Sequence, residues 1–322
     1  PSAALLLAPG ANIIFRTGST YAVDLAASGA SDRINVAGTA TLEGGTVAVT
    51  TLDADALYKD GSVFRILNAT GGLTGTFAGL TESSAFLDFK LGYDPTGAFL
   101  TLAVVRQFPD VARTINQRAA ASALSTLVRP TGSDGLAVYN SILLLGDNAA
   151  RAAFDASSGE IYASLLATRQ RQGAALGSRM ASRGQANLRE GLGIWGGVTA
   201  HDGKLDADKD LNAGQVSNNG NGGELGIDYR TAGNAWATGA SGGWQDGDTS
   251  LPSRGSSTQN KTWHIGGYLR RGTGGEGFTI VGYVAHANSD TKVTRNIAFG
   301  TIARTALAQT DVTTTSIGVD MR

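Results

Sequence analysis

Apolar and polar residues alternate with a period of two from Gly193 to the end of the chain. Apolar or aromatic side chains take every second position, in runs of about 9–11 residues, which is the length of a tilted strand that crosses a bilayer. Six runs include residues 194–199, 225–230, 236–244, 263–270, 278–284 and 315–321. The pattern predicts an antiparallel sheet with one apolar face and one polar face, although a sheet in water gives the same alternation.

The connections between these runs differ in length. Short turns at 231–234 and 271–276 alternate with long polar stretches at 201–222, 246–260 and 287–306. Short turns on one side and long loops on the other are typical of outer-membrane barrels. Tryptophans in or near strand ends predict an interfacial aromatic girdle. They are Trp195, Trp236, Trp244 and Trp263.

A long segment that is rich in arginine and contains no acid after its first turn precedes the sheet. Ser158 and Glu160 form a helix-start signal. Gly173 and Gly177 each weaken a helix by roughly 1 kcal/mol relative to Ala. We expect a helix over 158–190 that threads the pore of a barrel formed by the following strands. Its arginines are Arg169, Arg171, Arg179 and Arg183.

These arginines are candidate functional residues. We expect them to meet acidic residues of the polar sheet face, such as Glu224 or Asp228, with on the order of 1 kcal/mol per pair in water. Such pairs would locate the helix and seal the pore. A solvated, cationic helix face is the simpler interpretation of the same residues.

Alternating residues in the first third of the chain predict short strands that are separated by Gly and Asn turns. Small residues at the corners favour the end of a right-handed parallel β-helix, closed by a cap over 60–105 that protects the open edge. A β-sandwich is the alternative. The expected strands are 21–25, 33–36, 39–42, 46–50, 62–67, 87–91 and 99–105.

Helical patterns follow. Asp110 predicts the N-cap of a helix over 111–128, and further helices are expected over 135–145 and 148–156. The expected domains are a β-helix end with cap, a helical linker, a pore helix and an incomplete barrel. Their ranges are 1–107, 108–157, 158–190 and 191–322.

Composition supports repetitive β structure. The 322 residues include 45 Gly but only 16% charged residues, and the net charge of −1 gives no indication of nucleic-acid binding. No cysteine is present, which excludes disulfides and cysteine-held metals. No apolar run approaches the roughly 20 residues of a membrane helix.

Sites for catalysis or cofactors are poorly supported. Residues 191–196 match a dinucleotide fingerprint by letters, but a helix precedes and a strand follows, the reverse of what that site needs. Residues 239–243 match a nucleophile elbow, but they lie inside a strand pattern. The acidic run 206–210 lacks the glycine and glutamate of a calcium loop. His201, His264 and His286 have no metal-ligand spacing. We expect no enzyme activity, cofactor or metal.

Several strings resemble, in order and spacing, the C-terminal part of monomeric autotransporters, the type V secretion family. Residues 32–45 (DRINVAGTATLEGG) and 61–77, with GSVFRIL, GG and GTF, look like the pertactin-type autochaperone cap. The next matches are NQRAA at 116–120, SGEIYAS at 158–164 and IWGG at 194–197, where the barrel would start. The resemblance covers essentially the whole chain.

The resemblance implies a translocator barrel in a Gram-negative outer membrane and a passenger at the cell surface or secreted. The helix would end in the lumen, and the cap would fold first outside and template the solenoid. Implied partners are outer-membrane lipid, the chain's own passenger, the barrel-assembly machinery and periplasmic chaperones. We expect a monomer that binds no nucleic acid.

The sequence departs from the family at its ends. The family's barrel has twelve strands and a terminal aromatic residue, whereas six strands are expected here and the sequence ends Met321-Arg322. It begins at Pro1, without an initiator Met or a signal peptide. Because a closed barrel needs at least eight strands, we expect a fragment truncated at both ends.

Two other functions compete with secretion. A secreted β-solenoid adhesin or polysaccharide-binding protein would have a soluble, Gly-rich C-terminal sheet. A β-helix enzyme such as a polysaccharide lyase is disfavoured, because residues 1–105 contain no cluster of carboxylates and basic residues.

Overall fold

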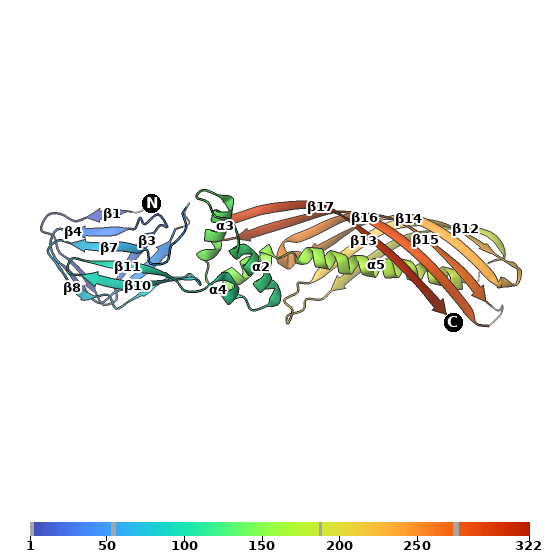
Figure 1. The fold of residues 1–322 in the computed structure, drawn as a ribbon, viewed down its shortest axis with the longest axis horizontal. Helices are drawn as coiled ribbons and strands as arrows, with labels where there is room; N and C mark the ends of the chain where they lie inside the picture. Colours follow the sequence, from blue (N-terminus) through green and yellow to red (C-terminus); the bar gives the residue numbers. More distant parts are fainter. Residues whose placement is uncertain (1–2, 53–55, 187–188, 273–276) are drawn as a thin grey trace. The chain divides into compact units, whose positions relative to one another are not determined.

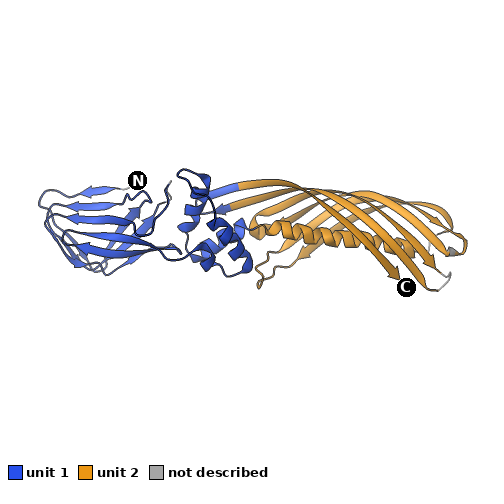
Figure 2. Cartoon of the chain, viewed as in Figure 1, with its two compact units in different colours: residues 1–158, 298–304 blue, residues 159–297, 305–322 orange. Residues whose placement is uncertain are grey.

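The computed structural model describes residues 3–52, 56–186, 189–272 and 277–322 (Figure 1). The chain divides into two compact units (Figure 2), residues 1–158 with 298–304 and residues 159–297 with 305–322. Hydrophobic clusters lie within each unit. Most of the regular structure is β, as the sequence predicted.

The second unit is built on one antiparallel sheet of six strands, in which each strand pairs with its neighbours in the chain. The predicted number and antiparallel order of strands are therefore confirmed, and the six described strands do not form a closed ring. The strands are β12 (Gly191–Leu205), β13 (Val216–Arg230), β14 (Trp236–Leu251), β15 (Ser256–Gly272), β16 (Thr279–Phe299) and β17 (Ile302–Met321).

The strands are longer than the sequence indicated, at 15 to 21 residues. The stretches 201–222, 246–260 and 287–306, which were predicted as long loops, are mostly strand. Only 206–215, the short helix η2 (Pro252–Arg254) with Gly255, and residues 300–301 turn the chain there. The prediction failed because these strand segments alternate in burial but not in hydropathy. Polar Thr258 and Thr291, for example, are 1% and 0% exposed.

The short turn predicted at 231–234 is present and includes the helix η1 (Ala232–Asn234). The other short turn, predicted at 271–276, lies partly outside the described residues. None of the described helices combines the length and the apolar character that are needed to cross a bilayer.

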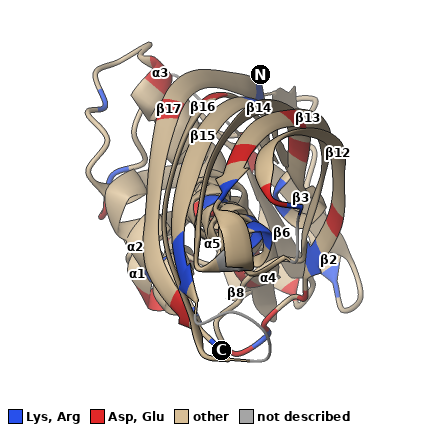
Figure 3. Ribbon diagram, turned by 90° about the vertical axis from the view of Figure 1, so that its right-hand side faces the viewer, with Lys and Arg blue, Asp and Glu red and all other residues tan. Residues whose placement is uncertain are grey.

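A single long helix, α5 (Glu160–Gln185), packs along the concave face of this sheet, and Figure 3 shows the strands curving around it. Its N-cap is Gly159, one residue after the predicted Ser158, whose hydroxyl instead donates to the carbonyl of Asp155 at the end of the preceding helix. Residues 187–188, at the predicted end of the helix, lie outside the described residues.

The first unit begins with three passes of chain that each contribute one strand to each of three parallel ladders. The ladders are β1-β4-β7, β2-β5-β8 and β3-β6-β9. Their inward side chains form one continuous core. The strands are β1 (Ala4–Leu6), β2 (Ile13–Arg16), β3 (Thr20–Leu25), β4 (Arg33–Val36), β5 (Ala40–Glu43), β6 (Thr46–Thr51), β7 (Val63–Ala69), β8 (Leu73–Thr76) and β9 (Gly79–Thr81).

A hairpin closes the end of these ladders. Strands β10 (Leu87–Asp94) and β11 (Gly97–Val104) pair antiparallel with each other, and β11 pairs antiparallel with β7. The direction of pairing thus reverses where the third pass ends. The reversal covers an edge that would otherwise offer unpaired backbone groups to another strand.

Four short helices follow, rather than the predicted three: α1 (Phe108–Val111), α2 (Ile115–Ser125), α3 (Asp134–Leu143) and α4 (Asp147–Ser157). The helix predicted over 111–128 is interrupted because Thr114 is extended and caps α2, accepting from the Gln117 N–H at 3.2 Å. Asp110 lies inside α1 rather than at its N-cap, and its carboxylate accepts from the Gln107 N–H at 2.8 Å.

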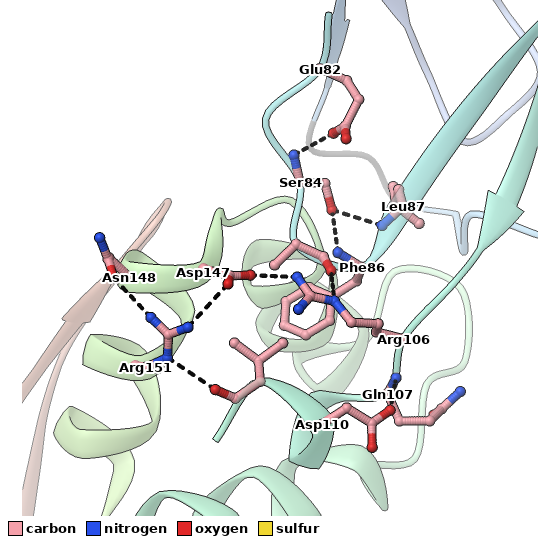
Figure 4. Close-up of polar contacts among 12 residues, drawn as sticks. Glu82, Ser84, Phe86, Leu87, Arg106, Gln107, Asp110, Asp147, Asn148 and Arg151 are labelled. Carbon is pink, nitrogen blue, oxygen red and sulfur yellow. Dashed lines mark hydrogen bonds and ion pairs between the residues drawn. The ribbon is translucent and has the colours of Figure 1, made fainter. Parts of the chain in front are cut away.

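Two arginines join these helices to the hairpin (Figure 4). Arg106 donates from Nε to the carbonyl of Ala85 at 2.6 Å and pairs with Asp147. Arg151 lies 3.0 Å from the same carboxylate and donates from Nε to the carbonyl of Val111 at 3.0 Å. Asp147 therefore ties the strand end to α4 through Arg106, and Arg151 ties α4 to α1.

Replacement of Phe108 tests the core between helices and hairpin. Its ring lies 4.9 Å from Phe86 and 4.7 Å from Tyr139, and the residue is 2% exposed. We expect Phe108→Ala to destabilise the first unit by about 3–5 kcal/mol. Hydrogen exchange of its amides in urea measures the loss. Ile115→Ala, at a position that is 81% exposed, should change stability by less than about 0.5 kcal/mol.

Acid should loosen the first unit through Asp147. The hydrogen bond from Arg106, together with the charges of both arginines, lowers the pKa of Asp147. A carboxyl whose pKa is lower in the folded state stabilises the fold above its unfolded pKa of about 3.9 and loses that contribution as pH falls through the folded value. Hydrogen-exchange protection of α4 should thus fall as the pH drops below about 3.9.

The matched variant is Asp147→Asn, which should lower protection of α4 at pH 7 and flatten this acid dependence. Asp206→Asn, at an exposed position after β12, should leave both unchanged. An unaltered acid profile in Asp147→Asn would show that other groups control the response.

Candidate functional site

The sheet face that points away from α5 is apolar along one part of every strand. Apolar side chains on this face are largely exposed, from Trp236 at 41% to Val198 at 94%. Soluble proteins rarely leave so large an apolar surface uncovered. Members of this surface are Leu192, Ile194, Val198, Leu225, Ile227, Tyr229, Trp236, Trp244, Trp263, Ile265, Leu269, Phe278, Val284, Ile317, Val319 and Met321.

Aromatic residues mark both limits of this apolar band. Trp244 and Trp263 are directly opposite each other in the register at one limit. Trp236 lies opposite Arg271 at the other, with the guanidinium 4.5 Å from the ring. Eight residue steps separate Trp236 from Trp244, or about 26 Å along the strand. At a tilt of about 40° the band is roughly 20 Å tall, close to the outer band of membrane barrels.

The same face becomes polar immediately beyond Trp244 and Trp263. The next outward row contains Asp246, Lys261 and Asp290, which face one another across β14, β15 and β16. Tryptophan thus gives way to charged residues within two positions. The same order of residues is found in membrane proteins where the lipid interface meets water.

Trp195 does not belong to this girdle, contrary to the prediction. Its ring lies on the side of β12 that faces α5, and the guanidinium of Arg183 stands 4.7 Å from it. The reason is parity: Ile194 and Val198 take the outward positions of β12, so Trp195 must point inward.

The opposite, concave face carries buried acids that contact the arginines of α5. Asp228 is 4% exposed, accepts from Nε of Arg183 at 2.9 Å and accepts from the hydroxyl of Tyr268 at 2.6 Å. Glu224 is also 4% exposed and lies 3.5 Å from Nε of Arg179. The structure thus brings together four residues that the sequence predicted to form ion pairs: Arg179 contacts Glu224, and Arg183 contacts Asp228. A role in sealing a pore stays a prediction.

The burial of both acids changes the expected energies. The sequence suggested about 1 kcal/mol per pair, the value for exposed ion pairs. Removing one partner of a buried pair leaves an uncompensated charge, which costs about 3–5 kcal/mol. These contacts therefore constrain the helix more strongly than exposed pairs would.

A third ion pair, missed from the sequence, fixes the other end of the helix. Glu160 lies 2.8 Å from Nε of Arg254 and accepts from the backbone N–H of Gly214 at 2.6 Å. Both charged side chains are 9% exposed. Glu160 is the only acid of α5, and that isolation was a signal that it has a specific partner.

The remaining arginines of α5 differ from each other. Arg169 is 5% exposed, whereas Arg171 is exposed. Arg171 and Arg179 line a cavity of about 240 Å³ between α5 and strands β12 and β13, together with His201 and Lys204. The lining of the cavity is mostly basic among its charged residues, with Asp202 as its one acid.

Close approach of α5 to the sheet depends on glycine. A Cβ atom at Gly173 would lie 2.4 Å from Thr314, one at Gly177 would lie 2.6 Å from the ring of Tyr283, and one at Gly184 would lie 2.6 Å from Val281. These glycines lower helix propensity and in return let the helix backbone approach the strands.

None of the weak motifs forms a reaction centre within the described residues. The 191–196 glycines are part of β12, and Asp208 caps its own loop through the Asp210 and Leu211 N–H groups. His201, His264 and His286 lie on different strands, and the described residues include no cluster of three metal-binding side chains.

Ser241 lies in the middle of β14, and its hydroxyl donates to Glu224 at 2.6 Å. His264 lies 3.9 Å from the same carboxylate. The acid therefore stands between Ser241 and His264. A catalytic triad requires the histidine between the serine and the acid, so that it can take the hydroxyl proton.

An antiparallel sheet with an apolar outer band, aromatic limits and a charged inner face is the arrangement of transmembrane β-proteins. Residues 194–321 match the family described as Autotransporter beta-domain. The match confirms, for residues 194–321, the resemblance drawn from the sequence, and it points to the bacterial outer membrane.

A curated relative is similar to part of this chain. The chain is 35% identical over 124 residues to an "Extracellular serine protease" of Serratia marcescens. The aligned stretch covers 35% of this chain but only 12% of that protein. The proteolytic activity in the relative's name is thus a property of a much longer chain.

A methyl group at Gly177 tests the close packing of α5. We expect Gly177→Ala to push the helix away from Tyr283 and to lower the melting temperature of the second unit in detergent. Ser178→Ala, on the exposed side of the same turn, should have little effect. The double variant Gly177→Ala with Tyr283→Ala should recover part of the loss. Equal melting of Gly177→Ala and the unchanged chain would contradict the packing described.

Proposed function

We propose that this chain is the membrane-proximal part of an autotransporter, which exports its own β-helical passenger and helps it to fold at the cell surface. In this proposal 191–322 form part of a transmembrane barrel, 158–190 the helix that threads its pore, 108–157 a linker, and 1–107 the end of the passenger with its autochaperone cap. The observation that carries the proposal is the two-faced sheet with ion pairs to α5.

The membrane role of the sheet is supported by its outer surface. Burying apolar side chains in lipid gains about 25 cal/mol per Å², and the exposed apolar band supplies such an area. Because open sheet edges are not tolerated in lipid, the six strands would act only as part of a closed ring with further strands. A soluble adhesin sheet, the alternative, would keep this large apolar surface in water.

The pore role of α5 is supported by its position on the polar face and by buried pairs spaced along it. Glu160, Arg179 and Arg183 each contact a residue of the sheet or its connecting loops. A helix held at both ends would remain in the lumen after export and obstruct ion flow.

The passenger role of the first unit is supported by its three parallel ladders. One strand per ladder in each pass is the arrangement of a parallel β-helix, which we propose to be right-handed, and such solenoids require a terminal cap. The hairpin β10–β11 supplies that cap. A preformed end would let further coils add one at a time, which supports an autochaperone role.

We further propose that these 322 residues perform no enzymatic reaction and use no cofactor. The partners would be outer-membrane lipid, the passenger, the barrel-assembly machinery and periplasmic chaperones, with a single copy of the chain per pore. Any proteolytic activity would reside in passenger sequence outside this chain.

The ion pairs give a direct test of the pore role. In the complete gene product, expressed in a Gram-negative cell, we expect Arg179→Glu with Arg183→Glu to raise ion conductance in planar bilayers and to reduce surface-exposed passenger several-fold, because like charges would then face each other. Conductance recordings and protease accessibility of the passenger measure both effects.

Restoration by charge exchange is the decisive control. Adding Glu224→Arg and Asp228→Arg should recover export and low conductance, whereas Arg171→Glu, at an exposed position, should alter neither. Unchanged export and conductance in the first variant would refute the pore role. Recovery of the complete product in the soluble fraction without detergent would refute the translocator as a whole.

A further inference from the structure

Arg169 is a buried cation whose surroundings differ from those of the paired arginines of the second unit. It is 5% exposed and lies midway along α5. Its Nη1 donates to the amide oxygen of Gln172 at 2.5 Å and to the hydroxyl of Thr262 at 3.4 Å. Within the described residues, its Nε and Nη2 have no hydrogen-bond partner. A guanidinium carries five N–H donors, so several remain available.

No carboxylate in the described part of the chain pairs with Arg169, whereas Arg179, Arg183 and Arg254 each pair with one. Taking a charge out of water without a counter-charge costs several kcal/mol. Neutral amides and hydroxyls satisfy hydrogen bonds but do not offset the charge. The site therefore lacks a negative charge rather than only a hydrogen-bond acceptor.

A small cavity adjoins this guanidinium. It has a volume of about 20 Å³ and is lined by Arg169, Gln172, Thr262, Ser289 and His264, among others. A cavity needs about 10–15 Å³ of such space to hold one water molecule. The cavity accordingly admits a single small occupant and excludes phosphate or sulfate.

The hydroxyls in this cavity add a donor. Thr262 and Ser289 lie 2.7 Å apart and share one hydrogen bond, for which either can be the donor. Two hydroxyls carry two hydrogens, so one remains for another acceptor. The lining thus offers positive charge and N–H and O–H donors, which is the chemistry that recognises a spherical anion.

We propose that Arg169, with the Thr262–Ser289 hydroxyl pair, binds one halide-sized anion, chloride under physiological conditions, between α5 and the sheet. The ion supplies the missing counter-charge and fixes the middle of the helix, between the Glu160–Arg254 pair and the Arg179–Glu224 pair. A water molecule in its place would satisfy hydrogen bonds and leave the cation uncompensated.

Bromide is the probe for this site. The complete protein in detergent is melted in sodium bromide, sodium chloride and sodium gluconate at constant ionic strength, since gluconate is too large for the cavity. A ligand that binds only the folded state stabilises it in proportion to ln(1 + [L]/Kd). We expect a saturable rise of several degrees with either halide and none with gluconate, together with anomalous bromide density beside Arg169 in crystals.

Variants separate this site from general salt effects. Arg169→Gln should abolish the difference between halide and gluconate, and Arg171→Gln should keep it. If Arg169→Gln does not fold, Thr262→Val, which removes a hydroxyl and keeps the charge, should weaken the halide response. Equal melting in all three salts, a halide response that persists in Arg169→Gln, or density for a protein carboxylate at Arg169 would each overturn the proposal. None of these outcomes bears on passenger export.

Discussion

Two carboxylates buried on the concave face of the sheet set the position of the long helix. Glu224 and Asp228 are four residues apart on β13, about 13 Å along an extended strand. Arg179 and Arg183 are four apart on α5, about 6 Å along a helix. Long side chains and the strand tilt bridge this mismatch. Sliding the helix by one turn would leave one acid without its cation, at a cost of several kcal/mol.

The two faces of the sheet place opposite demands on the same strands. The outer apolar positions are exposed and suit hydrocarbon, whereas the inner positions hold acids, hydroxyls and histidines that suit water and the helix. Because side chains alternate, shifting the register of any strand by one residue would exchange the faces. Trp195 shows how strict this is: although tryptophan favours the interface, its odd position in β12 turns it inward against Arg183.

Sequence patterns predicted those features of the fold that depend on hydropathy. They placed the six strands and the long helix, and they named the residues of two ion pairs. They failed where polar residues occupy regular structure, as at Thr258 and Thr291, which belong to long strands and not to loops. They also missed the break at Thr114, the Glu160–Arg254 pair and the burial of Arg169, because these depend on which elements meet in space.

Glycine content, the most conspicuous feature of the composition, has a specific cause in the second unit. Gly173, Gly177 and Gly184 thin the helix where it meets the strands, and on the sheet a Cβ at Gly226 would meet Trp195 at 2.3 Å. A helix enclosed by a polar sheet face needs small residues where it contacts the strands and charges opposite to those of the sheet. An apolar stripe matters less there. The buried residues of α5 are accordingly a mixture of small, polar, charged and apolar side chains. The hydropathy of α5 therefore shows no single apolar face, and its environment becomes evident only from its partners on β13, β15 and β16.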